Sequence, residues 1–130
     1  MPRDALILLG RILIAILFIP SGVNKLIGFS GTVGYLTNLG APMPEVAAAV
    51  AVACELGVGL MVLFGWKFRF AALVLAVFTV GTALIAHRFW AVPDAQMAMQ
   101  KINFMKNLAI CGGLLFAWAS GPGRWSIDKR

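Results

Sequence analysis

The sequence predicts an all-α integral membrane protein, a four-helix bundle in which residues 1–130 form a single transmembrane domain. Two observations support this fold class: the composition, and the gathering of apolar residues into four continuous runs. Hydrophobic residues make up 61% of the 130 residues and charged residues only 12%, whereas soluble domains are about half apolar and a quarter charged. A small soluble domain could not cover so much apolar surface with so few charges. We therefore expect lipid to cover the outside.

The four apolar runs have the length that a helix needs to cross the hydrocarbon layer, which is about 20 residues. The runs cover residues 5–27, 46–65, 70–86 and 102–119. A membrane β-barrel would instead need alternating strands of about ten residues. Helices also satisfy their own backbone hydrogen bonds within lipid, so they are the expected spanning form. The first run is too long for the apolar part of a signal peptide, and we expect it to remain as the first span.

The connections between the runs differ in character. Residues 28–44 are rich in Gly and Pro and predict a short interfacial or re-entrant piece rather than a fifth span. Residues 65–69 combine aromatic and basic side chains and predict a tight turn at the membrane interface. Residues 87–101 are polar and predict an amphipathic interfacial turn, and residues 121–130 predict a short, basic, exposed tail.

Basic residues predict the orientation, because cytoplasmic loops of membrane proteins carry an excess of Lys and Arg. With four spans both termini lie on one side. That side holds Arg3, Lys67, Arg69, Arg124, Lys129 and Arg130, whereas the other holds Lys25, Arg88 and Lys101. We therefore expect both termini in the cytoplasm.

The net charge of +6 does not indicate nucleic acid as a partner. The basic residues are scattered and flank the apolar runs, where they serve as membrane anchors rather than forming a continuous basic stripe. Cys54 and Cys111 lie inside apolar runs without CxxC spacing, so we expect inert thiols and no disulfide. Gly57, Gly59, Gly112 and Gly113 indicate places where helices approach closely.

Several charged side chains lie inside the apolar runs, where a charge costs at least about 2.5 to 3.5 kcal/mol at the bilayer centre. Glu55 stands near the middle of the second run, and Arg11 lies about two turns inside the first. Antiparallel packing would place them about 7 to 8 Å apart along the axis, which a long arginine side chain bridges. We predict an Arg11–Glu55 pair lining a polar pocket. The alternative is that Arg11 reaches back to the interface and Glu55 is protonated.

A second polar group gathers toward the side opposite the termini. It comprises Asn24 and Lys25 at the end of the first run, His87 at the end of the third, and Asn107 near the start of the fourth. The segment from His87 to Trp90 adds a titratable imidazole, a cation and two aromatic rings, which suits a flat molecule with a polar head, such as a quinone. The alternative is that Trp90 and its neighbours are ordinary interfacial residues.

Several chemistries are excluded. The chain has a single His, whereas a bis-histidine haem needs two axial imidazoles and a zinc site needs three or four suitable ligands. We therefore predict no metal site and no intrinsic cofactor. The sequence also contains no glycine-rich phosphate-binding loop.

A series of short motifs, taken in order, resembles the DoxX family of small bacterial and archaeal membrane proteins. The motifs are Arg11, Ser21-Gly22 and Lys25, then Gly40-Ala41-Pro42, Glu55-Leu56-Gly57, Gly65 with Arg69, His87-Arg88-Phe89-Trp90 and Asn107-Leu108-Ala109. Each motif is loose, but their order and spacing extend over nearly the whole chain. The resemblance implies a four-helix protein of the bacterial inner membrane. Members of this family have been linked with quinone-reactive respiratory modules and with complexes that handle oxidative or thiol stress.

The leading hypothesis is therefore a redox-linked subunit that interacts with quinone or another lipid-soluble small molecule. His87 and Glu55 would handle protons, and Arg11, Lys25 and Asn107 would set charge and orientation. Electrons would come from another membrane or redox protein. Whether the chain is itself an enzyme is left open, since function resides in sites rather than in folds.

Two other hypotheses belong to different classes. In the first, the chain is a non-catalytic accessory or assembly subunit of a membrane complex, and its small-residue faces pack against partners. In the second, it transports a small solute or proton past Glu55. Four spans would carry a solute only as a homo-oligomer, and no inverted repeat is evident. Besides lipid, the expected partners are thus other membrane proteins or copies of the same chain.

Overall fold

The computed structural model describes residues 2–129, and this part of the chain contains helices and loops but no strand. Four helical units are long and apolar enough to cross a membrane, which confirms the predicted all-α membrane fold. In order these units are α1 (Arg3–Ile27), the continuous unit α3 (Pro44–Val52), η1 (Ala53–Val58) and α4 (Gly59–Phe64), then α5 (Phe68–Ala86) and finally α6 (Asp94–Ser120). Two short elements complete the fold, α2 (Phe29–Asn38) and the 3-10 turn η2 (Phe89–Ala91).

Helix α2 lies in the Gly- and Pro-rich connection, as an interfacial piece rather than a span. Its ten residues are too short to cross the hydrocarbon layer. It packs against α3 and, less extensively, against α1. Helix α3 then begins at Pro44, in the first-turn position where proline lacks only a hydrogen bond that the helix would not form.

The turn between α4 and α5 is as tight as predicted. Gly65 adopts a left-handed conformation with φ of 67°, and Lys67 follows with φ of 46°. A glycine adopts this conformation at little cost, whereas a side chain at the same position would be strained. The Asp128 carboxylate accepts hydrogen bonds from the backbone N–H groups of Lys67 (3.0 Å) and Phe68 (2.8 Å). It thereby satisfies donors that the first turn of α5 leaves free.

Helix α6 begins earlier than the fourth apolar run. It starts at Asp94 rather than near residue 102, so most of the segment predicted as an interfacial turn is helical. Pro93 directly precedes the helix and Asp94 lies in its first turn, where a negative charge is stabilised by the helix dipole. The polar composition of these residues therefore indicates that this part of α6 lies outside the hydrocarbon, and does not indicate a break in the helix.

The C-terminal segment, residues 121–129, is only in part the exposed tail that its composition predicts, since Arg124, Trp125, Ile127 and Lys129 are exposed but the start of the segment is not. Gly121, Pro122 and Gly123 are buried. Further along, the Ile127 N–H donates to the Phe64 carbonyl (2.9 Å) and the Asp128 N–H to the Gly65 carbonyl (3.0 Å). The segment folds back across the α4–α5 turn, and we call it the C-terminal strap.

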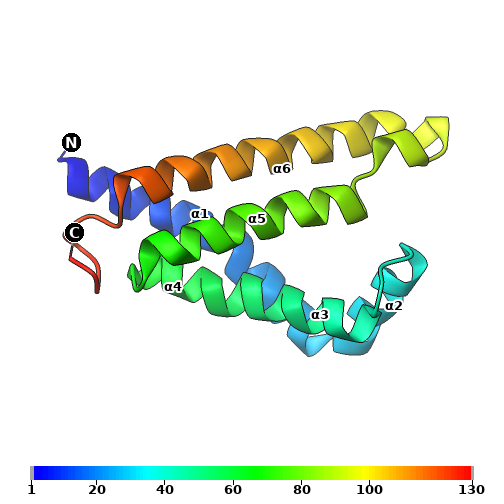
Figure 1. The fold of residues 1–130 in the computed structure, drawn as a ribbon, viewed down its shortest axis with the longest axis horizontal. Coiled ribbons are helices and arrows are strands. Elements are labelled where there is room, and N and C mark those ends of the chain that lie inside the picture. Colours follow the sequence, from blue (N-terminus) through cyan, green and yellow to red (C-terminus); the bar gives the residue numbers. More distant parts are fainter. Residues whose placement is uncertain (1, 130) are drawn as a thin grey trace.

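The four spans form two layers that diverge from one end of the bundle to the other. Figure 1 shows α5 and α6 lying together, while α1, α3 and α4 form the second layer. The layers meet near the end that carries both termini, which we call the terminal face, and they separate toward α2. Around the meeting point lies a core cluster of Phe18, Val62, Phe68, Ala71, Leu75, Ala76 and Leu114.

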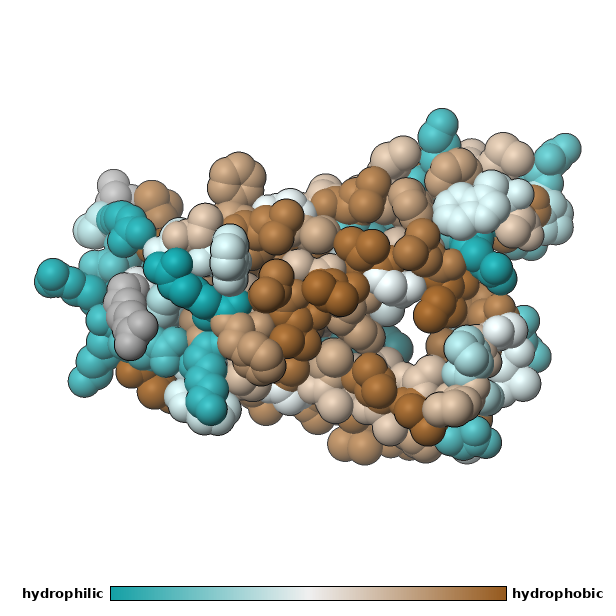
Figure 2. Space-filling view, in the orientation of Figure 1, coloured by the Kyte–Doolittle hydropathy of each residue, from teal (hydrophilic) through white to brown (hydrophobic). Residues whose placement is uncertain are grey.

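The outer surface of the bundle is apolar. Figure 2 shows a broad hydrophobic middle, with hydrophilic residues gathered at the two ends. Large apolar side chains point outward on every span, and Phe116 on α6 is 79% exposed. Contiguous apolar surface on this scale would drive aggregation in water, so the distribution of side chains agrees with a lipid environment.

Candidate functional site

A cavity of about 480 Å³ lies between the two layers, on the side of the bundle away from the terminal face. All four spans and α2 contribute to its lining. Most of the lining is apolar, with polar side chains on two opposing walls and at the α2 side. These polar residues are Ser21, Lys25, Thr32, Tyr35, Glu55, Thr79, Thr82, His87 and Asn107. The cavity thus collects four of the six residues that the sequence marked as ligand-binding candidates: Lys25, Glu55, His87 and Asn107.

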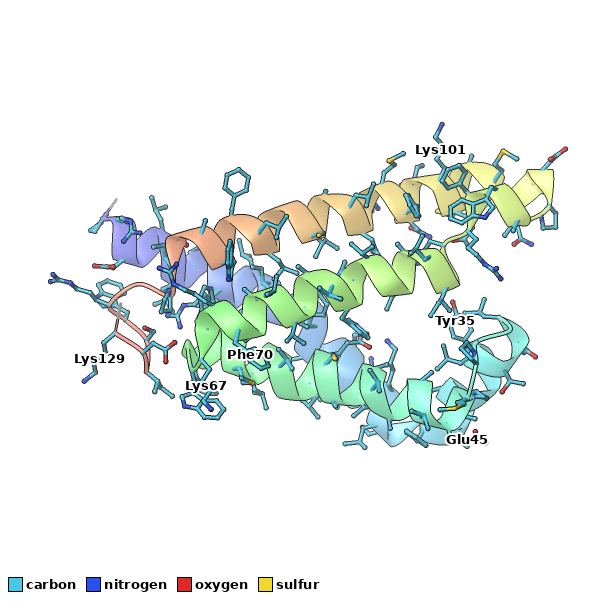
Figure 3. All side chains as sticks on the ribbon, viewed as in Figure 1. Tyr35, Glu45, Lys67, Phe70, Lys101 and Lys129 are labelled. Atoms are coloured by element: carbon cyan, nitrogen blue, oxygen red, sulfur yellow. The ribbon has the colours of Figure 1, made fainter. Side chains whose placement is uncertain are left out.

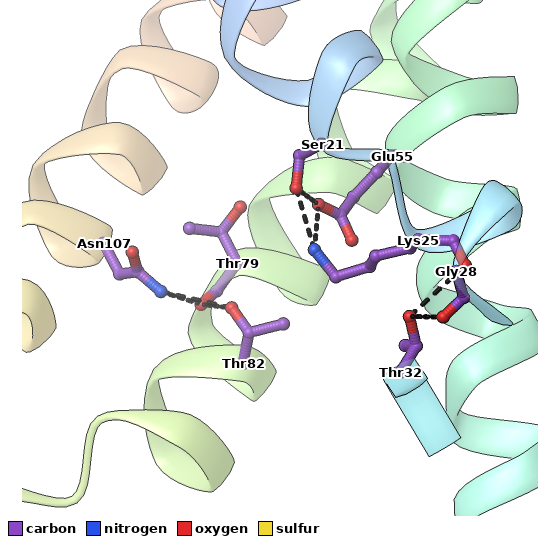
Figure 4. A network of polar contacts seen from close by, with 8 residues as sticks. All are labelled: Ser21, Lys25, Gly28, Thr32, Glu55, Thr79, Thr82 and Asn107. Atoms are coloured by element: carbon purple, nitrogen blue, oxygen red, sulfur yellow. Dashed lines mark hydrogen bonds and ion pairs between the residues drawn. The ribbon is translucent and has the colours of Figure 1, made fainter. Parts of the chain in front are cut away.

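The first polar wall is a three-residue cluster on α1 and η1 (Figure 4). The Lys25 ammonium lies 3.0 Å from Glu55 Oε1 and 2.8 Å from the Ser21 hydroxyl oxygen, to which it donates. The Ser21 hydroxyl in turn donates to Glu55 Oε1 at 2.5 Å. No described residue donates to Glu55 Oε2, so this oxygen is left for a ligand.

The direction of the lysine side chain explains why this pair forms. Side chains on a helix tilt toward its N-terminus. Lys25, at the C-terminal end of α1, therefore points back into the bilayer toward Glu55. Ser21 lies four residues earlier and so on the same helix face as Lys25, which allows one carboxylate oxygen to bind both side chains.

A π-helical segment positions the carboxylate. Glu55 lies in η1, where wider turns interrupt the α-helical span, and such insertions rotate the following side chains relative to a regular helix. Helix α1 approaches this segment closely at Gly22. A Cβ added there would lie 2.6 Å from the Leu56 backbone nitrogen, which is closer than real contacts allow. Gly22 is therefore required for the helices to meet at the level of Glu55.

The glycines marked from the sequence behave differently from one another. Gly59 does lie at a close approach, since a Cβ there would come within 3.2 Å of Ile19. At Gly57, Gly112 and Gly113 an added Cβ would meet no atom within 4 Å. The prediction of close packing is wrong within this chain for these three, and the decisive glycine is Gly22.

The second polar wall lies across the cavity on α5 and α6 (Figure 4). The Asn107 side-chain nitrogen donates to the Thr79 carbonyl (3.2 Å) and to the Thr82 hydroxyl (3.1 Å). Both donors of the amide are thus used within the wall. No described residue donates to the amide oxygen of Asn107, so the oxygen is available to a ligand.

His87 ends α5 at the outer part of the cavity. Its Nδ1 lies 2.9 Å from the Gln100 side-chain oxygen on α6. An amide oxygen only accepts, so Nδ1 carries the hydrogen and Nε2 of the neutral ring is the free acceptor. His87 thereby joins α5 to α6, and its Nε2 has no hydrogen-bond partner among residues 2–129.

Arg11 lies outside this site, and the predicted Arg11–Glu55 pair is wrong. The Arg11 side chain is only 2% exposed. It donates to the Leu63 carbonyl (3.0 Å) and to the Trp125 carbonyl of the C-terminal strap. The same side-chain tilt that directs Lys25 inward directs Arg11 toward the terminal face, away from Glu55. Within residues 2–129, Lys25–Glu55 is the one ion pair.

Trp90 also lies outside the cavity. It packs edge-on against Phe89 (5.1 Å between ring centroids) and Phe104 (5.6 Å), and it remains 54% exposed. Half-exposed aromatic clusters at the end of a bundle are typical of interfacial anchoring. Asn24 is likewise exposed and does not line the cavity.

Sequence reasoning missed several polar residues of the lining. Ser21 could have been found from its four-residue spacing to Lys25. Thr79 and Thr82 gave no such signal, because threonine inside an apolar helix usually bonds to its own backbone, as Thr79 does to the Leu75 carbonyl at 2.7 Å. Thr32 and Tyr35 come from α2, whose position the sequence did not predict.

Four apolar spanning helices, a lipid-compatible exterior and an interior ion pair define this chain as an integral membrane protein of the four-helix type. The profile of the DoxX family matches residues 6–88. The chain belongs to the DoxX family, which confirms the resemblance drawn from its motifs.

Similar proteins extend over nearly the full length of the chain. Inner membrane protein YphA of Escherichia coli K12 is 39% identical over 128 residues, which is 98% of this chain and 91% of that protein. Inner membrane protein YqjF of the same organism is 39% identical over 127 residues, which is 98% of this chain and 92% of that protein. Uncharacterized membrane protein Rv3486 of Mycobacterium tuberculosis is 28% identical over 127 residues, covering 92% and 77% of the two chains. No solved structure matches the chain.

Proposed function

We propose that this DoxX-family protein is a redox-linked membrane subunit that binds a lipid-soluble small molecule in the cavity between its two layers, with a quinone as the first candidate. The observation that carries the proposal is the pair of polar walls that face each other across an otherwise apolar cavity (Figure 4). Ligand sites in proteins are commonly apolar cavities with a few convergent polar groups.

The chemistry of the walls suits a flat head with oxygen atoms at both ends. On one side Lys25 supplies a cationic hydrogen-bond donor, held in place by Glu55 and Ser21. On the other side the Asn107 amide oxygen offers an acceptor. The Thr82 hydroxyl donates to the Thr79 carbonyl at 2.9 Å and accepts from Asn107, so it holds the amide in place. The reduced form of a quinone carries hydroxyl groups, and these would donate to the free oxygens of Glu55 and Asn107.

Proton handling falls to two residues in this proposal. Glu55 and the His87 imidazole line the cavity, and carboxylates and imidazoles are the side chains that most often act as general acids and bases. The electrons would come from a partner protein, because a single histidine leaves no bis-histidine haem within one chain.

We further propose that the chain resides in a bacterial inner membrane with both termini in the cytoplasm. Two relatives carry the description "inner membrane protein", and Figure 1 shows both termini at the same end of the bundle, as an even number of spans requires. A fluorescent-protein fusion to the C-terminus should be fluorescent, and an alkaline phosphatase fusion at the same point should be inactive. The reverse pattern would contradict this orientation.

A binding titration tests the ligand. The protein in lipid nanodiscs should bind a quinone analogue saturably, with about one site per chain. Lys25→Met should weaken binding about tenfold, because it removes a charged donor worth roughly 1.5 kcal/mol. Trp90→Ala, outside the cavity, is the matched control and should bind as the wild type does.

The titration also separates the redox subunit from an accessory subunit. Absence of saturable binding, together with a stoichiometric protein partner in mild detergent and no phenotype for His87→Ala or Glu55→Gln, would replace this proposal with a non-catalytic assembly role. Saturable binding that Lys25→Met leaves unchanged would place the ligand outside the cavity and contradict the assigned site.

A further inference from the structure

The cavity is blocked on the side of the terminal face. Between the cavity and that face the bundle is filled by the core cluster, in which Val62, Leu75 and Leu114 have no exposed surface. Phe18 belongs to this cluster and also lines the cavity, so it forms the boundary between the two. Protein interiors packed in this way leave no continuous path for water or solute.

The C-terminal strap adds a second barrier at the terminal face. Arg11 joins the Leu63 carbonyl on α4 to the Trp125 carbonyl of the strap. At Gly65 an added Cβ would lie 2.4 Å from Ser126, which shows how closely the strap covers the α4–α5 turn. The Asp4 carboxylate accepts a hydrogen bond from the Arg124 N–H at 3.0 Å, which ties α1 to the same segment.

The other end of the cavity is open. Helices α3 and α5 diverge there (Figure 1), and Figure 2 shows a hollow between the layers on the side of α2. Four apolar or aromatic residues of the lining keep much of their surface exposed: Leu17 (49%), Tyr35 (53%), Val50 (49%) and Ile85 (36%). A lipid-exposed apolar rim around a polar interior admits a molecule that has an apolar part.

Among the described residues, one polar contact at this end joins the loop after α2 to the loop after α5. Arg88, after α5, donates to the Leu39 carbonyl, after α2, at 3.3 Å. One exposed hydrogen bond contributes only about 0.5 to 1.5 kcal/mol. Few interactions therefore hold the two layers together at this end, whereas many do so at the terminal face.

We infer that the cavity is a dead-end chamber whose ligand enters and leaves from the bilayer leaflet opposite the terminal face, between α3 and α5. The ligand class is an amphiphile whose polar head reaches the two walls while its apolar part stays in the lipid. This inference rests on the proposed function for the identity of the ligand, but not for the accessibility of the chamber. A path across the membrane through one chain is absent, so transport through a single copy does not fit.

Site-directed labelling tests the accessibility directly. The reporter is Ala51→Cys in a background in which Cys54 and Cys111 are replaced by Ala. Ala51 lines the cavity and is buried one turn before Glu55. A second reporter, Ala47→Cys, lies one turn nearer the open end. Ser126→Cys in the strap serves as the marker of the terminal face. A charged, membrane-impermeant maleimide is applied to right-side-out and to inverted membrane vesicles.

Both cavity reporters should react at least about tenfold faster from the face opposite the termini, since thiol reactivity follows access. Ala47→Cys should react faster than Ala51→Cys, and Ser126→Cys should react only from the terminal face. Equal labelling of Ala51→Cys from both faces, or faster labelling from the terminal face, would overturn the dead end. Labelling of both cavity reporters from neither face would overturn the open mouth.

The result does not depend on whether a quinone binds. One-sided labelling without saturable quinone binding would leave the chamber and its entrance standing and remove only the proposed ligand. Quinone binding with two-sided labelling would leave the proposed ligand standing and remove the dead-end chamber.

Discussion

Each end of the bundle contains a charged side chain inside the membrane protein, but the two charges are bonded in different ways. At the terminal face the Arg11 guanidinium is buried and bonds to backbone carbonyls of α4 and the C-terminal strap. At the other end Glu55 bonds to Lys25 and Ser21, side chains that line an open cavity. Figure 3 shows Lys67 and Lys129 at the end where the layers meet and Tyr35 at the end where they lie apart.

This difference indicates that the residues that stabilise the fold and the residues proposed to bind a ligand lie at different depths in the membrane. Arg11 on α1 donates to carbonyls of two other segments, so it joins three segments, and it does not line the cavity. A carboxylate bonded through one oxygen only, beside an unbonded one, stays available for chemistry. We expect substitutions at the terminal face to change the free energy of unfolding and substitutions at the cavity to change ligand affinity.

The largest effect on stability is expected for Arg11→Leu. The change leaves the Leu63 and Trp125 carbonyls without their charged donor and frees the strap, which should lower the free energy of unfolding by about 3 kcal/mol. Thermal unfolding in mild detergent measures this loss. Arg3→Leu is the control, because Arg3 is exposed and, among residues 2–129, bonds only to the Ser120 carbonyl; it should change stability by no more than about 0.5 kcal/mol. Equal effects of the two variants would remove the distinction between the ends.

Gly22→Ala should have the next largest effect. The added methyl group meets the Leu56 backbone at 2.6 Å, and relieving such overpacking costs about 1 to 3 kcal/mol. The shift would also displace Glu55, so quinone-analogue affinity should fall together with stability. Gly10→Ala on the same helix is the matched control, because a Cβ there meets nothing within 4 Å. An unchanged melting temperature for Gly22→Ala would show that the close approach does not exist.

A smaller effect is expected for the Lys25–Glu55 pair. A double-mutant cycle of Lys25→Met and Glu55→Gln should give a coupling free energy of about 1 kcal/mol, because partial exposure of Lys25 weakens the attraction. Its side chain is 34% exposed, against 8% for Glu55. The same cycle built on Arg11→Leu and Glu55→Gln should show no coupling. A coupling in the second cycle and none in the first would restore the Arg11–Glu55 pair.

The smallest effect distinguishes two neighbouring residues in the far loop. His87 lines the cavity and Trp90 does not, so His87→Ala should weaken quinone-analogue binding about three- to tenfold, the equivalent of one hydrogen bond. Trp90→Ala should leave the affinity unchanged. The titration that defines the site measures both variants. A stronger loss for Trp90→Ala would move the site from the cavity to the aromatic cluster.

Most of the fold could be predicted because lipid imposes simple rules. A helix needs about 20 apolar residues to cross the hydrocarbon, and four runs of that length were visible. The boundaries of α6 and the strap could not be predicted in the same way. Asp94 to Lys101 is polar because it extends out of the hydrocarbon, not because the helix has ended. The strap is held by a few backbone hydrogen bonds and the Asp128 side chain, which leave no apolar pattern.

Part of the candidate site could be predicted, but its pairing could not. Intramembrane charge marked Glu55 as a residue that needs a partner or a cavity. Lys25 was marked as part of the polar group opposite the termini, and both residues line the cavity. The depth of Arg11 suggested a match with Glu55, but depth says nothing of the side-chain direction or the helix face. The π-helical segment around Glu55 changes that face, and no regular helical period would have revealed it.

The most direct test of the account is to map where the ligand sits. A photoreactive quinone analogue, bound to the protein in native lipid and cross-linked, should label residues 17–36 of α1 and α2 and residues 78–87 at the end of α5, as identified by mass spectrometry. Unlabelled quinone analogue should compete for this labelling. Label spread along the lipid-facing side of α6, with no competition and none in the cavity, would contradict the claim that the chamber is the binding site.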